Sequence, residues 1–329
     1  MRVLVTGASG MLGRAVARGV LAAGHKVRTF QRGVSGVDGA LDARGSITDP
    51  EAVRAAAEGV DAVIHLAAKV SFAGAPEDFR AVNVEGTRSL VAAARSAGAT
   101  RFVMVSSPSV AHAGLSIVGD DALPADPERA RGEYARTKAA AELLALEADE
   151  PGFAVVVVRP HIVWGPGDTQ LIERVVDRAS RGRLPLLSGG LALIDTTYVD
   201  NAASAMVAAL ERAEAVHGQS FVVSNGEPRT VSELLAGICG AAGVPRPGWS
   251  VPAAVAREAG GLIERVWAVR PGRDEPPMTR FLAEQLSTSH WYDQRRTRAS
   301  LDWQPAVTLD EGFERLRRWY AMDPGDRVS

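Results

Sequence analysis

The sequence of 329 residues has a single cysteine, Cys239, and aromatic residues make up only 5% of it. One cysteine cannot form an intramolecular disulfide, and a metal centre built from several cysteines is excluded as well. Cys239 follows the apolar run 234–238, so we interpret it as a core residue. No group of His, Asp and Glu has the spacing of metal ligands, and we predict no metal.

Charge of one sign and long hydrophobic runs are also missing. The 37 basic and 39 acidic residues leave a formal net charge of −2, which argues against nucleic acid or an anionic membrane as a partner. No apolar run approaches the ~18 residues of a transmembrane helix. The N-terminus lacks the basic-then-apolar layout of a signal peptide. We therefore expect a soluble, cytoplasmic protein without a transmembrane segment.

The chain does contain a regular alternation of short apolar runs and helical patterns. The runs predict strands at residues 2–5, 26–30, 61–66, 102–105 and 154–158, with a weaker one near 37–41. Helical periodicity predicts helices at 11–24, 50–58, 76–98 and 132–149. Strands that are apolar on both faces need helices on both sides. The pattern therefore predicts an α/β fold with a doubly wound parallel sheet of the Rossmann type.

After residue 160 the alternation loosens. We expect helices at 171–181 and 199–210, strands around 191–197 and at 220–223, and an amphipathic helix at 251–269. That helix is expected to pack on a lid, with a surface for lipid or a partner protein as the less favoured alternative. We place a dinucleotide-binding domain at 1–160. A smaller, mostly helical substrate-binding part follows at 161–329, with some elements returning to the sheet.

A glycine-rich turn joins the first predicted strand to the first helix. Gly7, Gly10 and Gly13 recur at every third position. Glycines here let backbone amides and a helix N-terminus approach a pyrophosphate without an intervening Cβ. Glycines also serve tight turns and close packing, but the strand-turn-helix context favours a nucleotide site. We expect cofactor contacts from Gly7, Ser9, Gly10, Met11, Leu12, Gly13 and Arg14.

The second strand ends in Gln31 and Arg32, where an acidic residue would bind the ribose hydroxyls of NAD. A neutral residue followed by an arginine suits the 2′-phosphate of NADP, and Arg14 could assist. A solvated surface arginine is the alternative for both guanidinium groups. We therefore predict NADP rather than NAD, with Gln31 and Arg32 in the cofactor site.

Tyr134 and Lys138 stand four residues apart in a predicted helix, so they share one face. An ammonium beside a phenol favours the phenolate. We therefore expect Lys138 to lower the pKa of Tyr134 and make it a proton donor or acceptor near neutral pH. Ser107, or its neighbour Ser106, follows a strand and could hold a substrate oxygen against the phenol.

In this order the motifs resemble those of the extended short-chain dehydrogenase/reductase family. The glycine turn, Asn83, Ser107 and Tyr134-x-x-x-Lys138 fall where that family places them, as do segments 159–160, 164–168 and 198–201. The resemblance implies that Ser107, Tyr134 and Lys138 are catalytic. It also implies cofactor contacts from Tyr134, Lys138, Ala67 and Pro160. At Ser46 the chain departs from the family, which usually has an acidic residue against the adenine there.

Within the family the chain is most similar to the 3β-hydroxysteroid dehydrogenase-like branch. More narrowly, it resembles the 2-alkyl-3-oxoalkanoate reductases of bacterial long-chain olefin biosynthesis. The segments behind this likeness are 107–110, 162–168, 195–201, 224–228 and 279–286, the last of them in the substrate-binding part. The likeness implies NADPH-dependent reduction of a lipid-like ketone. It further implies a homodimer formed through helices 76–98 and 132–149, and association with other enzymes of olefin biosynthesis.

Three other functions share parts of these motifs. A 3β-hydroxysteroid or sterol dehydrogenase is the first alternative. A nucleotide-sugar epimerase, which holds NAD tightly, is the second. A regulator that senses NADP without turnover is a non-enzyme alternative, but such proteins typically lose the tyrosine or the lysine, and this chain has both.

Several further residues have a structural interpretation beside a functional one. We interpret His65 as a buried, hydrogen-bonded side chain and Arg159 as a member of a structural ion pair. Asn83 could stabilise a strand–helix junction or a proton-relay water. Trp164 could flank the substrate or fill the core, and His112 could face substrate or solvent.

Overall fold

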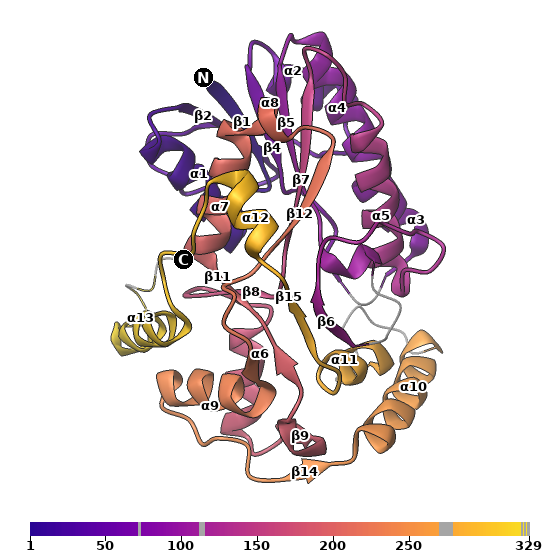
Figure 1. Ribbon diagram of the computed structural model, residues 1–329, viewed down its shortest axis with the longest axis vertical. Coiled ribbons are helices and arrows are strands. Elements are labelled where there is room, and N and C mark those ends of the chain that lie inside the picture. Colours follow the sequence, from indigo (N-terminus) through magenta and orange to yellow (C-terminus); the bar gives the residue numbers. More distant parts are fainter. Residues whose placement is uncertain (72–73, 112–115, 270–278, 324, 326, 328–329) are drawn as a thin grey trace.

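A parallel β-sheet of seven strands forms the centre of the computed structural model (Figure 1). The structure describes residues 1–71, 74–111, 116–269, 279–323, 325 and 327. Across the sheet the strands lie in the order β12-β7-β5-β4-β1-β2-β3. Their bounds are β1 (Arg2–Thr6), β2 (Lys26–Gln31), β3 (Leu41–Arg44), β4 (Ala62–His65), β5 (Arg101–Val105), β7 (Ala154–Pro160) and β12 (Gln219–Val223).

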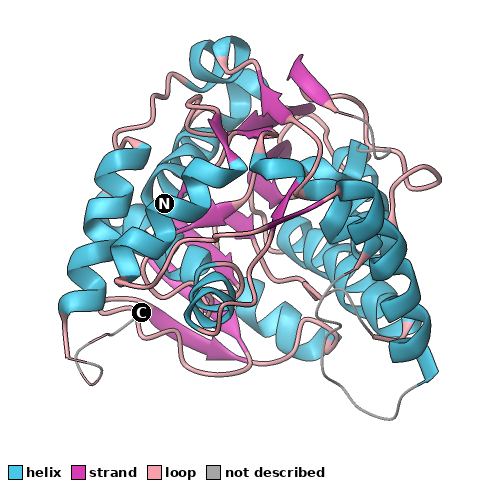
Figure 2. Ribbon diagram, turned by 90° about the horizontal axis from the view of Figure 1, so that it is seen from below, coloured by secondary structure: helices cyan, strands magenta, loops and turns pink. Residues whose placement is uncertain are grey.

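Helices cover both faces of the sheet, as the flanking helices of Figure 2 show. One face packs against α1 (Met11–Ala22), α7 (Val199–Glu211) and α8 (Ala213–Val216). The other packs against α2 (Pro50–Ala57), α4 (Gly86–Ser96) and α5 (Gly132–Leu146). Alternate residues of β1 enter the two cores, Val3 and Val5 on one side and Leu4 on the other. The predicted doubly wound α/β fold is confirmed.

The strand order reverses between β1 and β4, because the chain first adds β2 and β3 on one side of β1 and then returns to the other. All neighbouring strands are parallel, so their carboxyl ends meet at one edge of the sheet. A crevice at such a reversal is where open α/β sheets bind their ligands. The fold thus brings the ends of β1, β4 and β5 together as one candidate site.

Smaller sheets and helices form the rest of the molecule. A four-stranded sheet contains β13 (Arg229–Thr230), β10 (Leu193–Ile194), β15 (His290–Tyr292) and β6 (Ile117–Asp120). Two strand pairs join β8 (Val163–Trp164) with β11 (Thr197–Tyr198) and β9 (Leu186–Leu187) with β14 (Ser250–Val251). The helices are α6 (Ile172–Ser180), α9 (Val231–Ala242), α10 (Ala253–Val269), α11 (Arg280–Gln285), α12 (Arg295–Leu301) and α13 (Leu309–Ala321). A division of the chain at residue 160 stays a prediction.

The structure corrects three of the predicted elements. The weak strand expected at 37–41 is β3, which begins at Leu41. The strand expected at 191–197 is two short strands in different sheets, β10 and β11. The helix expected at 76–98 is broken into α3 (Pro76–Phe79), a π-helical turn at Arg80–Glu85 and α4. The π turn contains the buried Asn83, whose side chain bonds to a neighbouring loop rather than to its own helix.

The amphipathic helix expected at 251–269 is α10, and it packs beside α11 in the lower part of the molecule (Figure 1). Ala256 and Gly260 face α11, and a Cβ on Gly260 would lie only 2.7 Å from the backbone of Thr279. The opposite face leaves Val255 and Leu262 more than half exposed. None of the helices in the described ranges combines the length and hydropathy that a membrane-spanning segment needs.

Candidate active site

The glycine turn at the end of β1 is built for close backbone approach. Gly7 has a φ of +77°, a conformation that favours glycine. A Cβ on Gly13 would lie 2.2 Å from the Gly7 carbonyl oxygen, so only glycine fits where α1 meets the turn. Gly10 is the N-cap of α1, and no side chain caps the helix. The first amides of α1 therefore have no side-chain acceptor, as a pyrophosphate site requires.

The other predicted contacts of this turn surround it. Ser9 and Gly10 are exposed, while Met11, Leu12 and Arg14 are half-buried. The hydroxyl of Thr6 accepts the backbone N–H of Ala67 at 3.0 Å, which fixes Ala67 against Gly7 across the strand reversal. Pro160 ends β7 at the same sheet edge. The structure thus places these residues at the same carboxyl edge of the sheet, and their contacts with a cofactor stay predictions.

The side chain at the end of β2 makes hydrogen bonds within the protein that the sequence did not indicate. Gln31 is 6% exposed, and its Nε2 donates to the Asp42 carboxylate of β3 at 3.2 Å. Asp42 also accepts the Thr29 hydroxyl at 2.5 Å, and its hydrogen bonds hold the pKa of its carboxyl below the usual value against the opposing effect of burial. The Gln31 Nε2 is therefore already engaged within the protein, whereas its Oε1 is buried without a hydrogen-bond partner among the described residues. Its contact with a cofactor stays a prediction.

A second arginine joins Arg32 at this edge. The sheet register pairs Gln31 with Arg44, the last residue of β3. Arg32 and Arg44 are both exposed, and the structure gives neither side chain a hydrogen bond or an ion pair among the described residues. Sequence reasoning missed Arg44 because the strand was expected to end at residue 41. Recognising that β3 extends to 44 would have placed Arg44 beside the end of β2.

Ser107, Tyr134 and Lys138 come together at the ends of β5 and α5. The Ser107 side chain lies near enough to the Tyr134 phenol to lower its pKa, and its hydroxyl accepts the Ser109 hydroxyl at 2.9 Å. Ser106 is buried, and its hydroxyl has no partner among the described residues. Ser107, and not Ser106, is therefore the serine that meets the phenol. The Lys138 ammonium donates to the Val105 carbonyl at 2.6 Å, directly before the two serines.

The electrostatics of Tyr134 differ from the expectation. Burial raises its pKa to about 12, and the Ser107 side chain opposes that rise. Lys138 does not lower it here. Its ammonium donates to the Val105 carbonyl instead, and burial lowers the pKa of Lys138 to about 8. The phenol is accordingly protonated at neutral pH. It is therefore ready to donate a proton.

Asn83 locks the catalytic helix to the loop after β4. Its Oδ1 accepts the Lys69 backbone N–H at 2.7 Å, and its Nδ2 donates to the Thr137 hydroxyl at 3.0 Å. Thr137 lies between Tyr134 and Lys138 on α5, and its own hydroxyl donates to the Glu133 carbonyl. Of the two roles considered for Asn83, the structure displays the junction role.

Among the residues with two interpretations, those that the structure describes make structural contacts. His65 is buried, with its ring nitrogens 2.8 Å from the Thr6 hydroxyl and 3.0 Å from the Thr87 hydroxyl. Trp164 fills a core, where it stacks on Phe313 at 4.9 Å between ring centroids. Cys239 is buried and Ser46 shares a hydrogen bond with Thr48, while His112 lies outside the described residues. Among the described residues, no three His, Cys, Asp or Glu side chains gather as a metal site would need.

A second missed residue is Glu142, one turn beyond Lys138 on α5. It is fully buried, and Arg159 binds it through Nε at 3.1 Å to both carboxylate oxygens. The ion pair expected of Arg159 is thus present. The spacing of Tyr134, Lys138 and Glu142, four residues each, was the signal that could have identified the partner.

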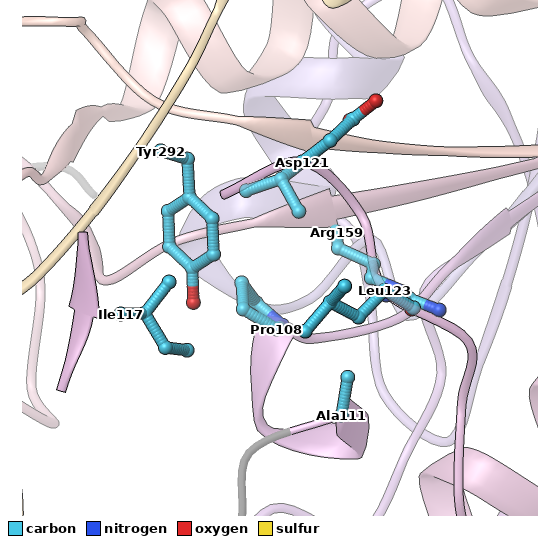
Figure 3. Close-up of a pocket in the computed structure, with 8 residues that line it drawn as sticks. Pro108, Ala111, Ile117, Asp121, Leu123, Arg159 and Tyr292 are labelled. Atoms are coloured by element: carbon cyan, nitrogen blue, oxygen red, sulfur yellow. The ribbon is translucent and has the colours of Figure 1, made fainter. Parts of the chain in front are cut away.

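A small cavity lies between the segment 108–111, which follows Ser107, and the four-stranded sheet (Figure 3). It measures about 10 Å³, room for about one water molecule. In Figure 3 the Tyr292 hydroxyl points into it beside Ile117. Its lining residues are Pro108, Ala111, Ile117, Asp121, Leu123, Arg159, Val222 and Tyr292. The segment 108–111, β6 and β15 thus line a cavity next to the catalytic Ser107.

Comparison with known proteins identifies the family. The model of the NAD-dependent epimerase/dehydratase family matches residues 3–224. The chain belongs to this family, the extended short-chain dehydrogenases/reductases, and it is an NAD(P)-dependent oxidoreductase that acts on CH–OH groups. The glycine turn fits the cofactor, because Gly10 is exposed at the N-terminus of α1 and no side chain caps that helix, so its first amides are open to a pyrophosphate.

Relatives of this family member match almost the whole chain. The 2-alkyl-3-oxoalkanoate reductase of Stenotrophomonas maltophilia is 41% identical over 326 residues, covering 96% of this chain and 98% of the relative. The enzyme of the same name from Shewanella oneidensis is 35% identical, covering 95% and 84%. The crystal structure of gox2253 superposes with a TM-score of 0.76 at 26% identity and covers 99% of both chains.

Proposed function

We propose that this oxidoreductase uses NADPH to reduce 2-alkyl-3-oxoalkanoates to 2-alkyl-3-hydroxyalkanoates, a step of olefinic hydrocarbon biosynthesis. The observation that carries the proposal is the 41% identity with a reductase of that name over 96% of the chain. The match extends through α10 and α11, beyond residue 224, where the family model ends. Likeness in these later residues supports a shared substrate and not only a shared cofactor.

Contacts between the catalytic helix and α11 support a role of the later residues in substrate binding. Glu284 of α11 is 8% exposed and pairs with Arg131 at 2.5 Å. Arg131 is the N-cap of α5, three residues before Tyr134. The end of the catalytic helix that carries the phenol is thus held against α11. A substrate that reaches Tyr134 would lie close to this contact.

In the proposed mechanism the protein positions the ketone and supplies the proton. A bound NADPH provides the hydride for the carbonyl carbon. Tyr134, protonated near neutral pH, donates its phenolic proton to the carbonyl oxygen. Ser107, whose side chain lies beside the phenol, donates to the same oxygen and fixes its position. Lys138 carries the ammonium that would meet the nicotinamide ribose.

NADPH is the proposed cofactor because β2 ends in the neutral Gln31, followed by Arg32, and the Asp42 carboxylate nearby is hydrogen-bonded within the protein. Arg32 and Arg44 lie at the ends of adjacent strands with no partner in the described structure. Guanidinium groups suit the planar oxygens of a phosphate. Arg14, half-buried at the start of α1, is a third candidate. We further propose a cytoplasmic homodimer, formed through the α4 and α5 side of the molecule, that associates with other olefin-biosynthesis enzymes.

The test is a nicotinamide absorbance assay with three substrates and both cofactors. The substrates are a 2-alkyl-3-hydroxy fatty acid, a 3β-hydroxysteroid and a UDP-sugar. We expect turnover of the alkyl hydroxy acid with NADP, slower turnover with NAD, and none of the UDP-sugar. Turnover of the steroid without turnover of the alkyl hydroxy acid would replace the proposed substrate by a sterol.

A further inference from the structure

The catalytic face of α5 continues one turn past Lys138 into a buried carboxylate. Tyr134, Lys138 and Glu142 follow one another at intervals of four residues, so they form a single row on the helix. Lys138 is 3% exposed and Glu142 is 0% exposed. A buried carboxylate is costly unless charged partners and hydrogen bonds compensate it. The partners of Glu142 therefore explain how the protein stabilises a buried negative charge at this position.

Four hydrogen bonds hold the Glu142 carboxylate. Arg159 donates three of them, with Nε 3.1 Å from each oxygen and a terminal nitrogen 2.5 Å from Oε1. The Ser220 hydroxyl of β12 donates the fourth at 3.0 Å. These hydrogen bonds fix the orientation of the carboxylate. Its negative charge therefore stays on the face of α5 that also carries Lys138 and Tyr134.

Arg159 connects this carboxylate to the segment that precedes the catalytic helix. It is 1% exposed at the end of β7, and its other terminal nitrogen donates to the Leu123 carbonyl at 2.6 Å. Leu123 lies between β6 and α5, on the wall of the small cavity next to Pro108 (Figure 3). One guanidinium thus ties together α5, β7 and the segment leading to Tyr134.

The surroundings of Lys138 leave Glu142 as its electrostatic support. From β4 it faces His65, whose pKa is lowered to about 3 by burial and by the Lys138 charge, so this ring is neutral. From β5 it meets the Val105 carbonyl, and Tyr134 on its own helix is a neutral phenol. Burial lowers the pKa of Lys138, and the field of Glu142 is what raises it.

We propose that Glu142, held by Arg159, is a positioning residue of the active site that keeps Lys138 charged, while the Val105 carbonyl holds its Nζ at the carboxyl end of β5. Glu142 touches neither substrate nor cofactor and acts only through the lysine. The inference rests on the proposed role of Lys138 at the nicotinamide ribose. It goes beyond that role by naming the residue that keeps the lysine protonated.

The test measures how binding of NADPH or NADP, followed by protein fluorescence, depends on pH. Binding should weaken as the pH rises past the point where Lys138 loses its proton. In the isosteric Glu142→Gln variant we expect the midpoint of that loss to move to lower pH by about one unit, because a neighbouring charge shifts a buried group by that much or more. Glu142→Asp should keep the midpoint near that of the unmodified protein, since it retains the charge.

Glu147→Gln is the matched control, because Glu147 is an exposed glutamate just beyond the end of the same helix. If Glu142→Gln does not fold, the double variant Glu142→Gln/Arg159→Gln removes both charges without leaving one unpaired. It should move the midpoint in the same direction by a smaller amount, because a cation that disfavours the charged lysine is lost as well. A folded Glu142 variant with lower thermal stability and an unmoved midpoint would overturn the proposal. Cofactor binding needs no ketone, so a wrong substrate assignment would leave this result unaffected.

Discussion

At the residue scale, the active site depends on how burial treats its two titratable groups. The Tyr134 phenol has a raised pKa and stays protonated, whereas the Lys138 ammonium has a lowered pKa of about 8. Burial disfavours the charged form of each, which shifts an acid and a base in opposite directions. The sequence predicted the pair but not these shifts, because burial is a property of the folded molecule.

Replacing the phenol tests its role as proton donor. Tyr134→Phe keeps the ring and removes the hydroxyl beside Ser107. We expect turnover to fall by about 10²–10⁴-fold, the range for a positioned acid, while the cofactor still binds. Steady-state rates and cofactor titration of the same preparation measure both effects. Near-normal turnover would remove Tyr134 from this role.

The two arginines at the ends of β2 and β3 allow the predicted preference for NADPH to be tested. The register of the two strands places them side by side. Arg32→Ala and Arg44→Ala should each weaken NADPH binding about tenfold, the effect of losing a hydrogen bond to a charged group. NADH binding should stay unchanged in both. Arg54→Ala, which replaces an exposed arginine in the last turn of α2, is the control. If only the Arg32 variant loses affinity, Arg44 does not contact the 2′-phosphate.

Exchange of Gln31 for aspartate, the acidic residue that an NAD site has there, is a poor test of cofactor preference. Its side chain is buried 3.2 Å from the Asp42 carboxylate, so a second carboxylate would be placed against the first. Like charges at that distance repel each other and destabilise the fold. A change in cofactor preference would then be mixed with a change in stability, and the arginine variants avoid this.

At the element scale, two glycines of the turn between β1 and α1 have different roles. Gly13 is needed for packing, whereas Gly10 is expected to contact the cofactor. A Cβ at position 13 would lie 2.2 Å from the Gly7 oxygen, while one at position 10 would lie 3.6 Å from it. Gly10 also has φ of −84°, which alanine adopts readily. The same substitution should therefore act differently at the two positions.

We expect Gly13→Ala to destabilise the protein by about 1–3 kcal/mol, the cost of overpacking. Gly10→Ala should keep its thermal stability and weaken cofactor binding, because the new methyl group lies on the exposed side of the turn. Denaturant unfolding and cofactor titration distinguish the two effects. Equal losses of stability in both variants would contradict this account of the turn.

At the scale of the whole molecule, a buried histidine in the centre of the sheet links stability to pH. His65 ends β4, and burial followed by the Lys138 charge lowers its pKa to about 3. The unfolded chain takes up the proton near pH 6.5, before the folded protein does. Stability from the neutral ring is therefore present above about pH 6.5 and is lost as the pH falls toward 3.

We expect the free energy of unfolding to fall by about 1.4 kcal/mol per pH unit across this window on account of His65. His65→Gln should flatten that slope, whatever its effect on stability at neutral pH. The unmodified protein, measured under the same conditions, is the reference for this slope. Denaturant titrations at several pH values give both slopes, and an unaltered slope in His65→Gln would exclude this ring as the source.

Local pattern was enough to predict much of this protein. Runs that are apolar on both faces predicted a parallel sheet covered on both sides, because their residues could be buried in no simpler way. The glycine spacing after the first strand and the Tyr134–Lys138 interval on a helix predicted the crevice and the catalytic pair, since both depend on neighbouring residues.

Tertiary structure decided everything that depends on residues far apart in the chain. Strands β6 and β15 are short and pair only with distant segments, so no local pattern marks them. Arg44 joins Arg32 only through the register of β2 with β3. Glu142 meets Arg159 only because α5 packs on β7. Short-range periodicity determines which residues form an element, whereas packing determines which charges meet and how strongly burial changes them.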